Sequence, residues 1–323
     1  MKKIVLLNSY FANAKPNYLD FYISSCAFNK TIDFVFFTNL NLEYNYPNIK
    51  IVKMEFEEFA GIIKNRISNG LKERGIWDEV RIPSPYKLCD FKVCLGYCLS
   101  EYIEGYDFWG GFDIDLIYGD IRAFVKEDIL NKYDKIYEHG HFSLIRNNKE
   151  CNEMFFENYE KSFKYVLMSD FNTFFEEIYE KPWMPAGGVN CRFDEKNKLY
   201  KSRNDFCDIS FKYHNLLDLK NVAKTNKVVI LFDKGKLYRC VEYKKAVLKE
   251  EILYSHFQKR NLSCNTENLS YFYVDNDSLN GVPQNEIDMF RNVRKIDFIT
   301  YRYFKFRYLD YFKRRREGAL NKK

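Results

Sequence analysis

Residues 107–120 read DFWGGFDIDLIYGD and place four aspartates among large apolar side chains. Phe, Trp, Ile, Leu and Tyr in such a run are typical of a buried strand. An unpaired carboxylate is costly to bury, so Asp113 and Asp115 need a positively charged partner. Residues two apart on a strand share a face, which predicts that both carboxylates point to one side while Ile114 points into the core.

The length and composition are those of a globular protein. The chain has 323 residues, of which 46% are hydrophobic and 30% are charged, and it contains 26 Tyr and 30 Phe. It is long enough to bury a core, either as one large α/β domain or as one domain with a smaller lobe. This composition disfavours disorder over most of the chain.

The N-terminus and the cysteines predict a cytoplasmic protein. The apolar run in MKKIVLLNSYF is interrupted at Asn8 and no small-residue cleavage site follows, so no signal peptide is expected. No window reaches the roughly 18 uncharged apolar residues of a membrane span. Nine cysteines at irregular spacings, without a CxxC pair, indicate reduced thiols and disfavour zinc.

The positive charge is concentrated at the C-terminus. The net charge of the chain is +6, but residues 291–323 hold twelve Lys/Arg and three Asp/Glu and so carry +9. The first 290 residues are therefore slightly acidic, at −3.

The first hundred residues predict a nucleotide-binding α/β sheet. β-Branched and aromatic residues predict strands, and apolar residues at helical spacing predict helices. Strand, helix, strand, strand is the typical opening of a Rossmann-type sheet flanked by helices. The predicted strands are residues 3–11, 32–39 and 49–54, and the predicted helices are one that follows Pro16, then 55–75 and 86–103.

The second half alternates helical and strand patterns. Residues 152–168 and 171–181 predict helices, and PWMPAGGVNCRF (182–193) predicts a loop that enters a strand. VVILFDKGKLYRCVEY (228–243) predicts a hairpin that turns at Lys234-Gly235. Residues 251–261 predict a strand that leads into a loop.

We divide the chain into three predicted parts. Residues 1–150 form a Rossmann-like half, and 151–265 form the second half of the same domain. Residues 266–323 form a C-terminal extension with a basic aromatic helix. No repeat or low-complexity linker separates these parts.

The spacing of Asp113 and Asp115 is compatible with a divalent ion. Carboxylate oxygens suit Mg²⁺ or Mn²⁺, especially when the phosphates of a substrate complete the coordination. An EF-hand calcium loop is disfavoured because Leu, Ile and Tyr follow Asp115. The alternative is that the two aspartates cap a strand end or pair with Lys or Arg.

Several motifs together resemble the GT-A class of nucleotide-sugar-dependent glycosyltransferases, and more closely a bacterial polysaccharide-biosynthesis family of uncharacterised type. The likeness lies in order and spacing over most of residues 1–261. The resemblance implies a GT-A-like, Rossmann-type mixed sheet whose DxD motif holds a divalent metal on the diphosphate of the donor. It also implies that residues 1–150 are the nucleotide-sugar-binding half and 151–265 the acceptor-binding half of one catalytic domain. The motifs are NSYF, PYKLCDFK (85–92), GYDFWGGFDIDLIYGDIR (105–122), GHFSLIRN (140–147) and SHFQKRN (255–261).

The resemblance implies a metal centre made of Asp113, Asp115 and His256. Asp113 stands at the first DxD position, near ribose or metal, and Asp115 is the principal ligand. His256 matches a C-terminal histidine that reaches the same ion, and Lys259 is close enough in sequence to contact the diphosphate. The alternative for His256 is a hydrogen-bonded histidine in a hydrophobic strand.

The donor site is expected to include further residues. By resemblance, Lys87, Asp90 and Lys92 bind the nucleoside or the phosphates, although the same residues could form a solvated charge cluster. Ser9 and Tyr10 follow the first strand, at the edge where nucleotides enter an open sheet. A dinucleotide fold and a P-loop are disfavoured because neither glycine motif is present.

The nucleotide itself is not settled by the sequence. Asn39 ends the second strand where relatives are expected to carry aspartate, so the contact with the base is open between UDP, which we favour, and GDP.

The acceptor side is expected in the second half of the chain. PAGGVN resembles a segment whose glycines, Gly187 and Gly188, let the backbone approach the sugar; a plain turn is the alternative. Asp205 and Asp208 are candidate catalytic carboxylates, since an inverting enzyme needs a general base, or they pair with Arg203.

The segment EHGHFSLIRN adds three candidate substrate contacts. His139 and His141 contact substrate or form structural hydrogen bonds. Arg146 contacts an anionic group or carries a surface charge.

The C-terminal segment suggests a membrane partner. Residues 299–323, ITYRYFKFRYLDYFKRRREGALNKK, interleave aromatic and basic residues, and such a helix can lie on an anionic membrane surface. Nucleic acid is disfavoured because the charge is confined to one terminus. The alternative is a packing helix with a solvated basic face.

These features predict a metal-dependent glycosyltransferase that uses Mn²⁺ or Mg²⁺. It would move a sugar from a nucleotide-sugar donor to a glycan or lipid-linked glycan during synthesis of a bacterial surface polysaccharide such as capsule. A peripheral position on the inner face of the cytoplasmic membrane would suit this activity. The alternatives are a nucleotidyltransferase and a non-catalytic carbohydrate-binding or scaffold protein on a GT-A-like fold.

Overall fold

The structure is a computed structural model that describes residues 1–293 apart from 158, 203, 209–227, 258–261 and 276. Lys259 and the predicted C-terminal helix lie outside the described residues, as does the side chain of Asp208. Within the described part, no helix combines the length and apolarity needed to cross a bilayer.

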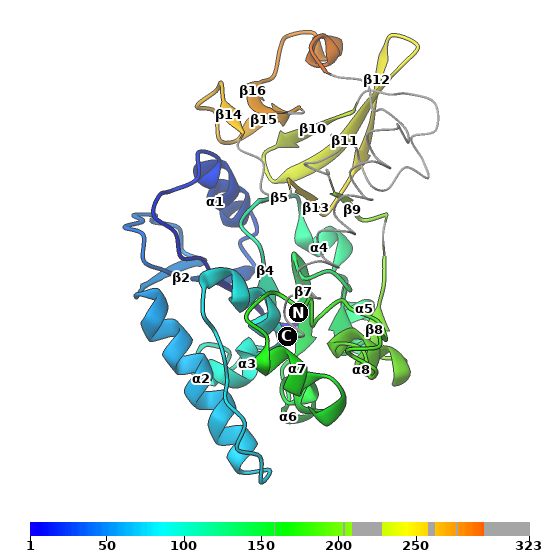
Figure 1. The fold of residues 1–323 in the computed structure, drawn as a ribbon. Helices are drawn as coiled ribbons and strands as arrows, with labels where there is room; N and C mark the ends of the chain where they lie inside the picture. The colour runs from blue at the N-terminus through cyan, green and yellow to red at the C-terminus, as the bar shows by residue number, and fades with distance from the viewer. Residues whose placement is uncertain (158, 203, 209–227, 258–261, 276, 294–323) are drawn as a thin grey trace.

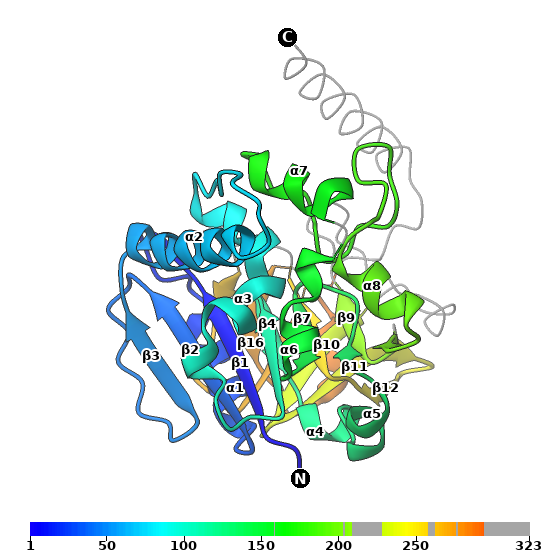
Figure 2. The same cartoon turned by 90° about the horizontal axis from the view of Figure 1, so that it is seen from below.

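A seven-stranded mixed sheet organises the first 200 residues (Figure 2). Strands β3, β2, β1 and β4 are parallel, and β7 is antiparallel to β4. This confirms the predicted α/β class and the first three strands. In sheet order the strands are β3 (Ile49–Lys53), β2 (Ile32–Thr38), β1 (Ile4–Ser9), β4 (Phe108–Phe112), β7 (Phe142–Arg146), β6 (Lys135–Ile136) and β8 (Leu199–Tyr200).

Both faces of this sheet are covered, because side chains alternate along each strand. Ile4 and Leu6 of β1 face one hydrophobic cluster, which also contains residues of helix α1 (Leu19–Phe28). Val5 and Leu7 face the other cluster, which contains the apolar side of helix α2 (Phe56–Lys72). The near-continuous apolar strands predicted from the sequence are therefore buried on both sides.

Helices of different lengths connect the strands. The predicted helix after Pro16 and the helix predicted over 55–75 are confirmed as α1 and α2. The α-helices are α1 (Leu19–Phe28), α2 (Phe56–Lys72), α3 (Leu95–Cys98), α4 (Ile121–Phe124), α5 (Glu127–Lys132), α6 (Lys149–Asn152), α7 (Phe163–Met168) and α8 (Val189–Glu195); 3-10 helices cover Pro85–Cys94, Ser100–Tyr102, Met154–Phe156, Tyr159–Lys161 and Glu286–Phe290.

A six-stranded sheet lies at the other end of the molecule (Figure 1). The predicted hairpin is confirmed: β10 and β11 are antiparallel, and Lys234 and Gly235 adopt φ of 46° and 93° in the turn. In sheet order the strands are β12 (Ala246–Glu251), β11 (Lys236–Tyr243), β10 (Val228–Asp233), β15 (Tyr271–Val274), β16 (Ser278–Gly281) and β14 (Ser263–Cys264).

The acidic stretch forms two strands instead of the single strand predicted. β4 ends at Phe112 in the large sheet, and β5 (Leu116–Tyr118) belongs to a three-stranded sheet with β13 (Tyr254–His256) and β9 (Phe206–Asp208). The chain leaves one sheet and joins another across the DxD motif. Ile114 is nevertheless buried in the core, as predicted.

Four further local predictions were wrong. Residues 86–103 form 3-10 turns around the short helix α3, and 189–195 form helix α8 in place of a strand. The described residues of 152–168 form two 3-10 turns and helix α7 instead of one helix. Residues 171–181 contain no helix, because their backbone groups bond elsewhere. The amides of Thr173 and Phe175 donate to Asp90, and the carbonyl oxygens of Phe175 and Ile178 accept from residues 188–189.

Candidate functional site

The candidate site lies at the carboxyl ends of β1 and β4. The sheet order places β2 on one side of β1 and β4 on the other, so the connections diverge between β1 and β4. Ligands of open α/β sheets bind at such a switch point, outside the carboxyl ends of the strands. The side-chain amide of Asn8 donates to the Phe112 carbonyl oxygen at 2.8 Å and so links the two strand ends.

Asp113, Asp115 and His256 converge at this point. One ligand atom from each lies within 4.8 Å of the others, so the three could hold a metal ion. The pairing of β13 with β5 brings His256 into the site, because its backbone lies opposite Leu116. The His256 Nε2 is 3.4 Å from Asp115 Oδ1, and the Phe257 amide donates to the Asp115 carbonyl oxygen at 2.8 Å.

Lys92 reaches the same cluster from the segment before β4. Its Nζ lies 2.5 Å from Asp113 Oδ1 and donates to the Gly140 carbonyl oxygen at 2.8 Å. Burial raises the pKa of Asp113 and the neighbouring Asp115 adds to it, while Lys92 and His256 oppose the rise. Asp113 therefore pairs with a lysine, as in the alternative stated from the sequence, and this ammonium partly meets the charge of one carboxylate. The predicted contact of Lys92 with the donor stays a prediction.

His256 is one of three histidines whose rings stack on one another. The centroid of the His141 ring lies 4.4 Å from that of His256, with an interplanar angle of 18°, and 5.0 Å from that of His139. His141 is buried, and its Nδ1 has no hydrogen-bond partner among the described residues. Burial and the neighbouring histidines hold the pKa of His141 well below its usual value, so this ring is neutral.

The residues predicted to contact the nucleotide lie at or just after the carboxyl ends of β1 and β2. Tyr10 follows β1, its amide donates to the Phe37 carbonyl oxygen at 2.9 Å, and burial followed by the charge of Asp115 raises its pKa. Asn39 follows β2 and accepts from the Ala12 amide at 3.1 Å. Ser9 ends β1 and is half-buried.

Tyr18 is a residue that the sequence analysis missed. Burial, and then the nearby Asp115, Tyr10 and Asp113, raise the pKa of this tyrosine. Tyr18 directly precedes α1, the helix that follows β1. A helix that follows a parallel strand begins near the carboxyl edge of the sheet, and this position is the signal that could have identified it.

Lys87 and Asp90 are fully buried and hold neighbouring backbone. Lys87 Nζ donates to Asp90 at 2.8 Å and to the carbonyl oxygens of Val166 and Phe171 at 2.9 and 3.0 Å. Asp90 accepts the amides of Thr173 and Phe175 at distances from 2.8 to 3.1 Å. The structure thus places them together, in a buried network, and their predicted contact with the donor stays a prediction.

The predicted acceptor residues are spread more widely. Arg146 lies at the end of β7 far from the DxD motif, because it is in register with Phe108, the first residue of β4. There its side chain forms an ion pair with Asp134 at 2.6 Å. Gly188 packs against the backbone: a Cβ there would lie 1.8 Å from the Phe175 carbonyl oxygen. Gly187, with φ of 65°, packs against a side chain: a Cβ there would lie 2.4 Å from the Cys191 Sγ.

Asp208 and Asp205, the two candidate general bases, lie in the chain at opposite ends of β9. Asp208 is in register with His256 on β13. Asp205 precedes the strand at its other end, where its carboxylate accepts the Tyr137 hydroxyl at 2.7 Å.

Comparison with known families assigns the chain to one of them. Residues 6–282 match the family of unknown function DUF6625. The chain belongs to this family. The DUF6625 match therefore includes the DxD motif, His141 and His256, and no curated protein matches the sequence.

Two solved structures of the galactosyltransferase LgtC are distantly similar to this DUF6625 member. LgtC in complex with donor and acceptor sugar analogues is 14% identical, with a TM-score of 0.34, over 64% of this chain and 75% of that one. An active-site mutant of LgtC is 13% identical, with a TM-score of 0.33, over 80% of this chain and 91% of that one.

Proposed function

We propose that this protein transfers a sugar from a nucleoside-diphosphate donor, with UDP favoured, to a growing bacterial surface glycan in a metal-dependent reaction. The observation that supports it is the convergence of Asp113, Asp115 and His256 at the switch point between β1 and β4. A sheet of this order binds nucleotides at this edge. Each of the five motifs that resemble GT-A glycosyltransferases contributes one residue here: Asn8, Lys92, Asp113, His141 and His256.

The chemistry of the three side chains fits a divalent ion. Two carboxylates and one imidazole supply three ligands, and waters or phosphate oxygens would complete the shell. Mg²⁺ prefers oxygen ligands in near-ideal octahedral geometry, whereas Mn²⁺ accepts a nitrogen more readily. We therefore expect Mn²⁺ to bind more tightly than Mg²⁺.

The residues around this centre have distinct roles in the proposed reaction. A bound divalent ion supplies Lewis-acid stabilisation of the charge that grows on the leaving diphosphate. Lys92 keeps a positive charge beside Asp113: burial alone would lower its pKa, but the adjacent carboxylate raises it above its usual value. Tyr10 and Tyr18 remain protonated beside the aspartates and can donate hydrogen bonds to the donor.

Asp208 is the better placed of the two candidate general bases. Its backbone is in register with His256, at the metal end of β9. Asp205 lies three residues earlier, about 10 Å away along a strand, and is bound to Tyr137. We assign the acceptor-activating role to Asp208 and expect Asp208→Asn to lower turnover more than Asp205→Asn.

A panel of nucleotides tests the donor. The full chain is melted with UDP, GDP, CDP or CMP, each with Mn²⁺, with Mg²⁺ or with EDTA. We expect one diphosphate, UDP by preference, to raise the melting temperature with Mn²⁺, and EDTA to erase the increase. At a ligand concentration one hundred times Kd the stabilisation is about 2.7 kcal/mol.

Donor hydrolysis measured on the same samples distinguishes an enzyme from a binding protein. Slow metal-dependent release of UDP from a UDP-sugar is the expected result. Equal melting temperatures with and without every nucleotide would contradict the proposal, and stabilisation without any hydrolysis or transfer would favour a carbohydrate-binding or scaffold protein.

His141 is expected to orient the metal-binding ring of His256. Replacing His141 by Ala removes the ring stacked at 4.4 Å and should weaken Mn²⁺ binding by about 10-fold or more, as is typical for residues that support metal ligands. His141→Phe keeps an aromatic ring and should retain most of the affinity. Mn²⁺ titration followed by electron paramagnetic resonance measures both, and equal affinity in the wild type and His141→Ala would refute the positioning role.

A further inference from the structure

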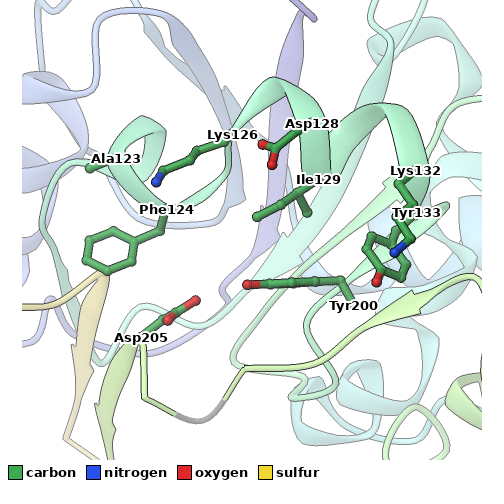
Figure 3. Close-up of a pocket in the computed structure, with 9 residues that line it drawn as sticks. All are labelled: Ala123, Phe124, Lys126, Asp128, Ile129, Lys132, Tyr133, Tyr200 and Asp205. Atoms are coloured by element: carbon green, nitrogen blue, oxygen red, sulfur yellow. The ribbon is translucent and has the colours of Figure 1, made fainter.

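A pocket of about 480 Å³ lies outside the proposed metal centre (Figure 3). Its walls come from α4, α5, the end of β8 and the residue before β9. Asp113, Asp115 and His256 do not line it. The volume is within the range of small-molecule sites, and the sequence motifs do not account for the pocket.

Aromatic rings form one part of the pocket wall. Phe124, Tyr133 and Tyr200 all line it and are half-buried. The Tyr200 ring is held from two sides, with ring centroids 5.4 Å from Tyr133 and 5.7 Å from Tyr137. Figure 3 shows the Tyr200 side chain extending across the pocket toward Asp205. Such fixed, partly exposed rings offer a flat apolar surface at low entropic cost to a ligand.

Charged side chains complete the wall and balance one another. Lys126 and Lys132 contribute two positive charges, and Asp128 and Asp205 contribute two negative charges. Asp205 is held in place by the Tyr137 hydroxyl at 2.7 Å. A nucleoside diphosphate would meet two carboxylates here, whereas a neutral ligand with many hydroxyls can use both the donors and the acceptors.

We propose that this pocket binds a neutral sugar unit of a glycan, separately from the metal centre. The C–H bonds of a sugar ring carry partial positive charge and pack on the electron-rich face of an aromatic ring such as Tyr200. Its hydroxyl groups donate to Asp128 and Asp205 and accept from Lys126 and Lys132. This site is argued from the pocket alone and does not depend on the proposed transferase activity.

Saturation-transfer difference NMR of the full chain with lactose, maltose and chitobiose tests the proposal. EDTA is present throughout, so that binding at the metal centre does not contribute. We expect at least one disaccharide to bind with a Kd in the millimolar range. Tyr200→Ala should weaken this binding at least tenfold, whereas Tyr200→Phe should retain it.

Three further variants separate binding in the pocket from other effects. Ala123→Trp, at an exposed position on the rim, should block binding without removing any core contact, and so covers the case in which Tyr200→Ala is unstable. Tyr179→Ala removes an exposed tyrosine elsewhere and should bind as the wild type does. Asp115→Asn should also bind normally, even where it abolishes the metal-dependent nucleotide effect.

Three results would overturn the assignment. These are no binding of any of the disaccharides, wild-type binding by both Tyr200→Ala and Ala123→Trp, or loss of binding in Asp115→Asn. The last would place the sugar at the metal centre instead of in this pocket.

Discussion

Asp115→Asn is expected to abolish the metal-dependent stabilisation by nucleotide and to lower glycosyl transfer at least 100-fold. Asp115 is buried, lies 3.4 Å from His256 and is one of the three converging ligands. An amide is a much weaker ligand for a hard cation than a carboxylate. Thermal melting with UDP and Mn²⁺, together with transfer from a UDP-sugar, measures both effects.

The same substitution should leave the metal-free protein folded. Asp115 raises the pKa of Asp113 through its negative charge, so removing that charge relieves repulsion between two neighbouring carboxylates. We therefore expect a metal-free melting temperature equal to or above that of the wild type. Asp194→Asn, an exposed aspartate paired with Lys201, is the matched control and should keep the full nucleotide effect. A wild-type response by Asp115→Asn would remove the basis of the proposed metal centre.

Asp90→Ala should destabilise the fold by about 3–5 kcal/mol, the range found when one partner of a buried ion pair is removed. Both side chains of the Lys87–Asp90 pair are fully buried. The variant leaves the Lys87 ammonium without its carboxylate and the amides of Thr173 and Phe175 without their acceptor. Urea unfolding of the two proteins measures the difference in the free energy of unfolding.

Two comparisons test the cause of this loss. Lys87→Met combined with Asp90→Leu removes the unpaired charge, so the double variant should be less destabilised than Asp90→Ala. Glu157→Ala breaks the exposed ion pair with Lys196 and should change stability by less than about 1 kcal/mol. If Asp90→Ala unfolds at the wild-type urea concentration, the buried network does not hold residues 166–175 as described.

Local sequence patterns were sufficient for much of the fold. The apolar residues of β1 and β2 and the spacing of α2 predicted these elements, because side-chain periodicity reports which faces are buried. The turn at Lys234-Gly235 was predicted by its own chemistry, since glycine readily adopts positive φ. The requirement that Asp113 and Asp115 meet positive charge also followed from the sequence, because burying a lone carboxylate is unfavourable anywhere in a protein.

Contacts between distant segments required the tertiary structure. Residues 171–181 have a helical pattern, but Asp90 and residues 188–190 take their backbone hydrogen bonds, and tertiary partners override local propensity. Tertiary contacts also assemble the candidate site. Strand pairing brings His256 to Asp115 and places Asp208 and Asp205 at opposite ends of β9.

The sequence by itself determined that the chain forms an α/β sheet with a paired acidic motif after a buried strand. Only the tertiary structure decided that Lys92 lies beside Asp113, that His141 stacks on His256 and that Tyr200 lines a separate pocket. The physical reason is the separation along the chain between the interacting residues. Periodicity and turn chemistry act between neighbours in the chain, whereas the partners of buried charges and rings come from segments that meet only when the chain folds.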